Sequence, residues 1–183
     1  MSSNKIKVAF LDRDGVINEE VNYLHEIEKF KYTYRFKEGV KRLKSLGYEI
    51  VIVTNQAGIA KGIFSQENYS ELTSWYIKDL ERDNIDILDV YYCPHHPNGI
   101  LPELSYDCIC RKPKPGMLLM AEKEHNIDLK ESILIGDKIS DAKAGVNANL
   151  KHVFLVSTGH YIDRNEWDEP IYDSILEVAG LLS

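Results

Sequence analysis

Apolar and polar positions follow two different patterns along this chain. Segments with one pattern alternate with segments of the other, which predicts strands separated by helices. Short, nearly continuous apolar runs are typical of strands that a parallel sheet buries on both faces, and they occur at residues 5–11, 48–53, 88–92, 132–135 and 152–156. Apolar residues spaced three and four apart predict helices over residues 38–46, 65–84, 117–125, 140–148 and 174–182. Gly47 is a stop signal for the first helix, and Ser65 with Asn68 indicates the start of the second.

This order of elements predicts an α/β fold, a Rossmann-like three-layer sandwich in which helices cover both faces of a central parallel sheet. Ligands bind such sheets at the carboxyl ends of the strands, so the residues that follow each strand are the first candidates for function. A length of 183 residues suits a single domain over residues 1–183 and can bury a sizeable core.

Composition and charge exclude several classes of protein. The net charge of −7 argues against a nucleic-acid partner, because neutralising phosphates of a duplex needs clustered lysine and arginine. The longest apolar run covers only residues 117–121, whereas a membrane helix needs about 20 residues. The amino terminus carries no targeting signal, so we expect a cytoplasmic protein with no membrane partner. Nothing in the sequence indicates an obligate dimer surface, and a monomer is expected.

Two pairs of carboxylates follow predicted strands. Asp12 and Asp14 come directly after the first strand, where they could act as a nucleophile and a general acid around a divalent cation such as Mg²⁺. Asp137 and Asp141 leave the fourth strand where a helix begins. Each pair alone has a simpler explanation. The first fits a polar turn, and the second fits a helix start in which Asp137 or Ser140 is the N-cap.

Two further groups could hold an anion. Thr54, Asn55 and Gln56 leave the second strand, and a hydroxyl and an amide there could bind a phosphoryl oxygen, although turn or cap chemistry is the more frequent explanation for such residues. Arg111 and Lys112 open a basic loop whose prolines restrict the backbone, although the same residues fit a solvated turn. The four groups are more specific together than any of them is alone.

The three cysteines lie within 18 residues of one another, together with two histidines. Cys93, His95, Cys108 and Cys110 form the three-sulfur, one-nitrogen set that Zn²⁺ favours in closed structural sites. Cytosolic thiols rarely form disulfides, which favours the metal over a cross-link. Three buried, reduced thiols are the alternative. We predict a zinc loop over residues 93–110 that holds the adjacent basic loop rigid, with His96 outside the ligand set and either exposed or in contact with substrate.

The order Asp-x-Asp, Thr, Lys and Gly-Asp-x-x-x-Asp resembles the haloacid dehalogenase-like (HAD) phosphotransferase superfamily, from about residue 5 to residue 156. Phe-Leu-Asp-Arg-Asp-Gly at 10–15, Thr-Asn-Gln-Ala-Gly-Ile-Ala at 54–60 and Cys-Pro-His-His-Pro at 93–97 resemble the D-glycero-D-manno-heptose 1,7-bisphosphate 7-phosphatases more narrowly. The related histidinol-phosphate phosphatases share the zinc loop and most of these motifs.

The resemblance implies a role for each motif residue. Asp12 would be the nucleophile that forms an aspartyl-phosphate, and Asp14 would be the general acid and base. Mg²⁺ would be bound by the carboxylates of Asp12 and Asp137 and by the backbone carbonyl of Asp14. Thr54 and Lys112 would bind the transferred phosphoryl group and complete the catalytic set.

The resemblance also implies a substrate-binding set: Glu20, Val21, Asn22, Tyr23, Thr54, Asn55, Gln56, Arg111, Lys112 and Lys138. Arg111 suits a second, non-reacting phosphate, since its planar fork binds oxygens in pairs. Asn22 replaces a glycine that the family often has at this position, which affects the expected choice of substrate and anomer rather than the chemistry. Asp141 is expected to orient its loop rather than bind the metal.

The spacing of the motifs implies a capless HAD core. Only 39 residues separate Asp14 from Thr54, and the later gap holds one helix, one strand and the zinc loop. The implied activity is removal of the C7 phosphate of a heptose 1,7-bisphosphate, giving heptose 1-phosphate for nucleotide-activated heptose of lipopolysaccharide or capsule. Histidinol-phosphate phosphatase is the alternative within the resemblance. A phosphotransferase or mutase, and a catalytically silent zinc-stabilised binding module, are alternatives of other classes.

Overall fold

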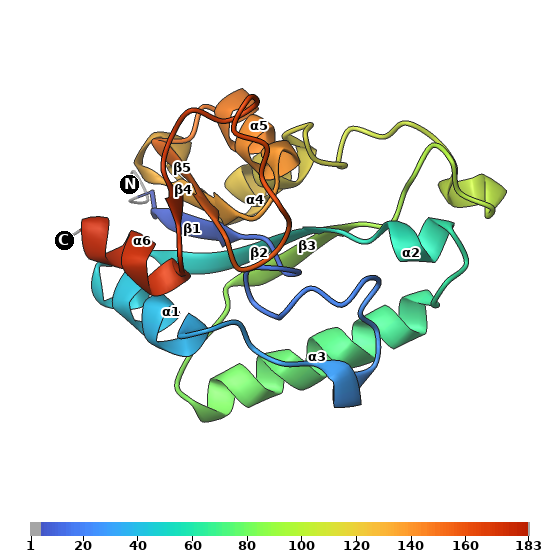
Figure 1. The fold of residues 1–183 in the computed structure, drawn as a ribbon, viewed down its shortest axis with the longest axis horizontal. Coiled ribbons are helices and arrows are strands. Elements are labelled where there is room, and N and C mark those ends of the chain that lie inside the picture. The colour runs from blue at the N-terminus through green and yellow to red at the C-terminus, as the bar shows by residue number, and fades with distance from the viewer. Residues whose placement is uncertain (1–4, 183) are drawn as a thin grey trace.

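The computed structural model describes residues 5–182, and its centre is one parallel sheet of six strands in the order β3-β2-β1-β4-β5-β6 (Figure 1). Every pair of neighbouring strands is parallel. The strands are β1 (Val8–Leu11), β2 (Glu49–Asn55), β3 (Asp89–Cys93), β4 (Ile133–Gly136), β5 (His152–Val156) and β6 (Ile171–Tyr172).

Helices cover both faces of this sheet, which confirms the predicted three-layer α/β fold. One face carries α1 (Phe36–Ser45), α3 (Gln66–Arg82) and α6 (Ile175–Leu181), and the other carries α4 (Gly116–His125) and α5 (Ile139–Asn147) (Figure 1). A short helix, α2 (Ala57–Ala60), follows the carboxyl end of β2.

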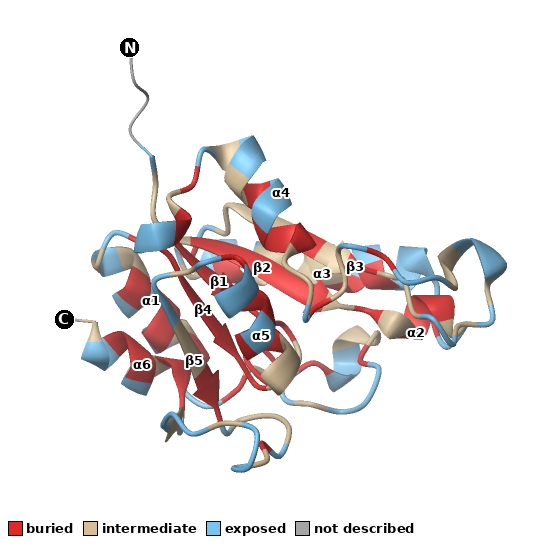
Figure 2. Cartoon of the chain, turned by 90° about the horizontal axis from the view of Figure 1, so that it is seen from above, coloured by how far each residue is buried: buried red, intermediate tan, exposed pale blue. Residues whose placement is uncertain are grey.

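Alternating residues of β2 divide the core into two parts. Ile50 and Ile52 pack with the side chains of α1, α3 and α6, whereas Val51 and Val53 pack with those of α4 and α5. All four side chains are fully buried, because the sheet is covered on both sides (Figure 2). Burial on both faces explains why the strands appear in the sequence as continuous apolar runs.

The ends of several elements follow local signals in the sequence. The Ser65 hydroxyl accepts a hydrogen bond from the Asn68 N–H at 3.1 Å, and the Asn68 side chain accepts one from the Ser65 N–H at 3.0 Å, so the predicted start of α3 is confirmed as a capping box. Ser174 caps α6 through the N–H of Glu177 at 3.3 Å.

Other boundaries differ from the prediction. The first strand begins at Val8 rather than at residue 5, and β2 continues through Thr54 and Asn55, which pair with Tyr92 and Cys93 of β3. Thr54 and Asn55 are therefore the last residues of a strand rather than a turn. The sequence pattern missed α2, β6 and three 3₁₀ helices, because segments of two to four residues are too short to show a period: Ile27–Lys29, Pro102–Leu104 and Leu129–Glu131.

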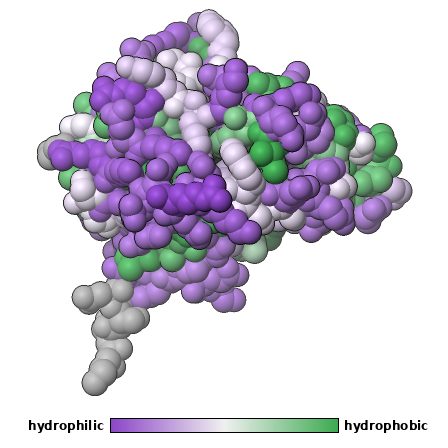
Figure 3. Space-filling model, turned by 90° about the horizontal axis from the view of Figure 1, so that it is seen from below, coloured by the Kyte–Doolittle hydropathy of each residue, from purple (hydrophilic) through white to green (hydrophobic). Residues whose placement is uncertain are grey.

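Polar side chains dominate one face of the surface. The face seen in Figure 3 is mainly hydrophilic, with smaller hydrophobic areas between the polar side chains. Within residues 5–182, no helix is long and apolar enough to cross a membrane.

The sheet reverses its order next to β1, and this reversal fixes the position of the site. From β1 the chain continues to β2 and β3 on one side, whereas β4, β5 and β6 lie on the other side. The crevice at such a switch point, outside the carboxyl ends of the strands, is where open α/β sheets bind ligands.

Candidate active site

Two carboxylates leave the sheet side by side at this switch point. Leu11 of β1 pairs with Ile135 of β4, and the Asp12 N–H donates to the carbonyl of Ile135 at 3.0 Å. Asp12 and Asp137 therefore follow adjacent strands, and Asp141 lies one helical turn beyond Asp137. One oxygen atom from each of these three carboxylates lies within 4.8 Å of the others.

Lys112 enters this group from the basic loop. Its Nζ lies 3.0 Å from Asp12 Oδ1 and 2.6 Å from Asp141 Oδ1, and it donates to the Val53 carbonyl at 2.7 Å. Burial alone would lower the pKa of Lys112, but the carboxylates of Asp12 and Asp141 outweigh it and raise the pKa, so the ammonium stays charged. The structure thus brings together four residues that the sequence spreads over 130 positions.

The carboxylates are crowded enough to change their own protonation. Burial, followed by the nearby charge of Asp141, raises the pKa of Asp12 to about 6, while Lys112 and Lys138 limit the rise. Burial and the charge of Asp12 likewise raise the pKa of Asp137. A bound cation would favour the charged form of both groups.

The residues present fit a divalent cation at this point. Asp137 Oδ1 is buried and has no hydrogen-bond partner among the described residues, whereas Asp137 Oδ2 accepts from the N–H of His160 at 2.9 Å and lies 2.7 Å from His160 Nδ1. Gly15 and Gly159 surround the same carboxylate so closely that a Cβ at either position would lie 2.3 or 2.1 Å from Asp137 Oδ2. Asp137 therefore offers a buried carboxylate oxygen without a partner next to the carboxylate of Asp12. Carboxylate oxygens are ligands that Mg²⁺ accepts.

Asp141 binds the backbone of the turn that leads from β4 into α5. Its Oδ2 accepts from the N–H groups of Asp137 at 3.2 Å and of Lys138 at 3.0 Å, and its Oδ1 faces Lys112. The carboxylate therefore fixes the turn from β4 into α5. Lys138 is the N-cap residue of α5, so neither Asp137 nor Ser140 has the capping position considered from the sequence.

Asp14 lies in a different electrostatic environment from Asp12. The fully buried guanidinium of Arg13 binds its Oδ1 at 2.7 Å, Asn18 Nδ2 donates to Oδ1 at 3.0 Å, and Gln56 Nε2 donates to Oδ2 at 3.1 Å. Burial would raise the pKa of Asp14, but the charge of Arg13 and these hydrogen bonds outweigh it and lower the pKa. Gln56 also donates to Thr54 Oγ1 at 2.9 Å, which links Asp14 to the end of β2.

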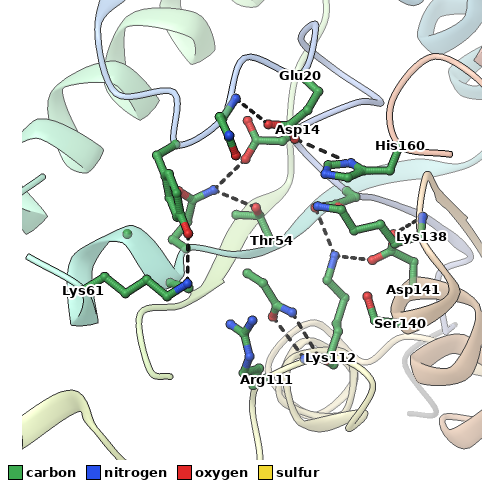
Figure 4. A pocket seen from close by; sticks show the side chains of 17 residues that line it. Asp14, Glu20, Thr54, Lys61, Arg111, Lys112, Lys138, Ser140, Asp141 and His160 are labelled. Carbon is green, nitrogen blue, oxygen red and sulfur yellow. Dashed lines mark hydrogen bonds and ion pairs between the residues drawn. The ribbon is translucent and has the colours of Figure 1, made fainter. Parts of the chain in front are cut away.

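A cleft of about 300 Å³ opens above these groups (Figure 4). Most of the residues predicted for the site line it: Asp12, Asp14, Glu20, Asn22, Tyr23, Thr54, Asn55, Gln56, Arg111, Lys112 and Lys138. Asp137 lies fully buried beneath the cleft, and Val21 is 43% exposed and does not line it. Further residues line the cleft that the predicted set does not contain: Ala57, Gly58, Lys61, Ser140, Asp141 and His160.

His160 and Arg13 are functional candidates that sequence reasoning missed. His160 comes from the irregular segment after β5, which carries no strand or helix pattern to place it near β4. Its ring nitrogen also lies 3.7 Å from Glu20 Oε2, on the opposite side of the cleft from Lys61 (Figure 4). Arg13 lies between the two predicted aspartates, and complete burial of an arginine, which is rare unless the charge is paired, is visible only in the structure.

The predicted zinc ligands lie together at the end of β3. Cys93, His95, Cys108 and Cys110 are grouped so that neighbouring ligand atoms are 3.2–3.6 Å apart. In tetrahedral zinc sites with bonds of about 2.1–2.3 Å, ligand atoms lie roughly 3.6–3.8 Å apart, so this group could hold the ion after a small expansion.

The surroundings of this group also fit a metal. Burial, followed by the neighbouring thiols, raises the pKa of Cys93 far above its usual range, and a bound cation would reverse that effect. His95 Nε2 lies 2.7 Å from the hydroxyl of Tyr106, the type of outer partner that orients a metal-bound imidazole. His96 lies outside the group, as predicted.

Asn55 joins the basic loop, which directly follows the zinc loop, to the sheet. Its Nδ2 donates to the carbonyl of Lys112, and its Oδ1 accepts from the N–H of Lys112, both at 3.1 Å. Arg111 donates to the carbonyl of His95 at 3.3 Å. Asn55 was predicted to recognise substrate, and in the structure both polar atoms of its amide bind the backbone of the loop that carries the two basic residues.

Known proteins resemble this chain in sequence. Residues 109–177 match the family model described as "HAD-hyrolase-like". A D-glycero-α-D-manno-heptose-1,7-bisphosphate 7-phosphatase from Photorhabdus laumondii is 60% identical over 160 residues, which is 87% of each chain. The chain belongs to the family of D-glycero-D-manno-heptose-1,7-bisphosphate 7-phosphatases. A β-anomer enzyme of the same organism is 45% identical, covering 84% of this chain and 82% of the other.

A solved structure of this family has the same fold. The D,D-heptose 1,7-bisphosphate phosphatase from B. bronchiseptica, complexed with magnesium and phosphate, superimposes with a TM-score of 0.83 at 25% identity and covers 97% of this chain and 98% of the other. The HAD fold expected from the motif order is therefore confirmed, and the group of one histidine and three cysteines is consistent with a zinc site.

Proposed function

We propose that this chain removes the C7 phosphate of D-glycero-D-manno-heptose 1,7-bisphosphate and leaves heptose 1-phosphate for the synthesis of lipopolysaccharide or capsule. The observation that carries the proposal is the buried group of Asp12, Asp137, Asp141 and Lys112 at the floor of a polar cleft, in a chain that is 60% identical to an enzyme of that name. A phosphorylated sugar fits this cleft, because its walls carry hydrogen-bonding and basic side chains rather than apolar ones.

In the first half-reaction, an oxygen of Asp12 attacks the phosphorus of the C7 phosphate, and the bond from phosphorus to the sugar oxygen breaks. Asp14 donates its proton to that leaving oxygen. Arg13 holds Asp14 ionised before substrate binds, and the negative charge of a bound phosphate favours the protonated form. We therefore expect Asp14 to take up its proton as the substrate enters.

In the second half-reaction, the Asp14 carboxylate takes a proton from water as the water oxygen attacks the aspartyl-phosphate. The bond to Asp12 breaks, and inorganic phosphate leaves. Lys112 and Thr54 bind oxygens of the transferred phosphoryl group in both steps. Lys112 suits this role because its ammonium is buried and stays charged beside Asp12.

Two metal ions complete the proposal. Asp12 and Asp137, with the backbone carbonyl of Asp14, would hold Mg²⁺, which when bound offsets the negative charge of the phosphoryl oxygens. Cys93, His95, Cys108 and Cys110 would hold a structural Zn²⁺, because four protein ligands leave no open position for a substrate. The buried free oxygen of Asp137 and the spacing of the sulfur and nitrogen atoms support these assignments.

For the anomer, we propose a preference for the α form. The chain is 60% identical to the P. laumondii relative named for the α anomer and 45% identical to the one from the same organism named for the β anomer. A direct test compares kcat/KM on the two synthetic anomers. A higher value on the β anomer would overturn this part of the proposal without affecting the reaction.

The substrate class is tested by initial rates on heptose 1,7-bisphosphate and on histidinol phosphate at equal concentration with Mg²⁺. We expect the bisphosphate to react faster by a large factor. Faster reaction of histidinol phosphate would assign the chain to histidine biosynthesis, and equally low rates on both substrates would refute the sugar assignment. Transfer of the phosphoryl group to a sugar hydroxyl rather than to water would identify a mutase.

A further inference from the structure

The end of the cleft farthest from the carboxylates carries two basic side chains. Lys61 and Arg111 line it on the side opposite His160 and Lys138 (Figure 4). Within residues 5–182, neither Lys61 nor Arg111 forms an ion pair with a carboxylate, whereas Lys112 in the same cleft has two. Although the protein is acidic overall, these two cations at one end of its cleft have no carboxylate partner among the described residues.

Lys61 is held in position from two directions. Its N–H donates to the Ala57 carbonyl at 3.0 Å at the end of α2, and its Nζ donates to the Tyr23 hydroxyl at 2.9 Å. An ammonium group has three N–H donors, so at least one remains for a ligand after Tyr23 is bound. The Lys61 side chain is therefore held in one orientation and still has an N–H donor available for a ligand.

The zinc loop fixes α2 as well as Arg111. The carbonyl of Ala60, one residue before Lys61, accepts hydrogen bonds from the N–H of Ile100 at 2.8 Å and from the N–H of Leu101 at 3.1 Å. Lys61 and Arg111 are thus attached to the same loop through different contacts.

Both side chains line one cleft, and among residues 5–182 neither is paired with a carboxylate. Bringing cations together without acidic partners is unfavourable, and an anion bound between them would remove that cost. A phosphate dianion has the charge and the oxygens that an ammonium and a guanidinium bind.

We propose that Lys61, together with Arg111, binds the phosphate that is not transferred and is thereby a specificity-determining residue of the reaction. This inference rests on the proposed function, since it requires a substrate with a second phosphate. Tyr23 is the positioning residue that orients Lys61 across the cleft. Lys112 and Asp12 bind the reacting phosphate at one end, and Lys61 with Arg111 binds the other phosphate at the far end.

The test compares two substrates in three variants: Lys61→Ala, Lys61→Arg and, as a matched control, Lys123→Ala. Lys123 lies on the exposed side of α4 and does not line the cleft, so its loss removes the same charge elsewhere. For each protein, kcat/KM is measured on heptose 1,7-bisphosphate and on heptose 7-phosphate, which lacks the second phosphate. Equal melting temperature and zinc content confirm that each variant is folded.

We expect Lys61→Ala to lower the ratio of kcat/KM for the bisphosphate to that for the monophosphate by about 10- to 100-fold, the range for loss of one charge-assisted hydrogen bond. Most of the change should be in KM. Lys61→Arg should restore most of the ratio, and Lys123→Ala should leave it at the wild-type value. An unchanged ratio in Lys61→Ala would overturn the assignment and identify Lys61 as a solvated surface lysine. A wild-type protein without preference for the bisphosphate would instead refute the proposed function, and the second phosphate site with it.

Discussion

The two sides of the cleft are built in different ways. The carboxylate wall consists of Asp12, Asp137 and Asp141, each 5% exposed or less, on the ends of buried parallel strands and the helix that follows. The loop wall consists of residues 20–25, 57–64 and 94–111, where the only regular elements are α2 and the 3₁₀ helix Pro102–Leu104. The first wall is fixed by the hydrophobic core, and the second by contacts between polar groups, including the candidate zinc ligands.

This difference separates the two tasks that we assign to the site. A chemical step needs reacting groups held within a fraction of an ångström, which the ends of packed strands provide. Selecting a substrate needs a wall that can differ between related enzymes, which loops allow. Lys112 and Asn55 connect the two, since Lys112 directly follows the loop wall in the sequence and ion-pairs with Asp12 and Asp141.

The largest expected effect comes from the carboxylate wall. Asp12→Asn should lower kcat by about 10³-fold or more, because an amide cannot form the aspartyl-phosphate. The melting temperature should not fall, since the change removes one of several crowded buried charges. Stopped assays of phosphate release measure the first effect, with Asp86→Asn on the exposed surface as the control. Activity near the wild-type level would mean that another residue attacks phosphorus.

The second effect concerns the loop wall. His95→Ala should abolish binding of about one zinc per chain, whereas His96→Ala should retain it. If only a few of the ~10–16 kcal/mol measured for finger peptides apply here, the melting temperature falls by roughly 5–15 °C. The loss of kcat/KM should be greater on the bisphosphate than on a small aryl phosphate. A zinc-free protein with an unchanged melting temperature would exclude a structural role for the metal.

A smaller effect tests how tightly the carboxylate wall is packed. Gly159→Ala would place a Cβ 2.1 Å from Asp137 Oδ2 and 2.7 Å from the Cα of Gly15. We expect a loss of about 1–3 kcal/mol in the free energy of unfolding and weaker binding of Mg²⁺. Gly180→Ala is the matched control, because its Cβ would meet no atom within 4 Å and alanine favours a helix. Equal stability and equal Mg²⁺ affinity in the two variants would show that the carboxylate wall can accommodate the added methyl group at little cost.

The smallest effect tests the connection between the walls. Asn55→Ala removes both hydrogen bonds to the Lys112 backbone and should lower the free energy of unfolding by about 1–2 kcal/mol. Because Lys112 would then be held less firmly, kcat should fall together with stability. Chemical denaturation and steady-state rates measure the two quantities. A raised KM with unchanged stability would instead favour the direct contact with substrate that the sequence predicted.

The difference between the carboxylate wall and the loop wall also explains which features of the protein the sequence could predict. The strands were visible because burial on both faces leaves continuous apolar runs, and Asp12, Asp137 and the four zinc ligands were visible because their motifs are local. His160 and Lys61 were missed, since the segments that carry them have no period. Their roles depend on contacts across the fold, such as the bond from His160 to Asp137 and the one from Lys61 to Tyr23.

If the carboxylate wall removes one phosphate while the loop wall binds the phosphate that stays on the sugar, phosphorus NMR of a single reaction will show it. The protein is incubated with heptose 1,7-bisphosphate and Mg²⁺ until phosphate release stops. We predict that the C7 monoester signal disappears, that one equivalent of inorganic phosphate forms, and that the anomeric C1 phosphate signal remains. Loss of the C1 signal, or release of two equivalents of phosphate, would show that the cleft does not distinguish the two phosphates.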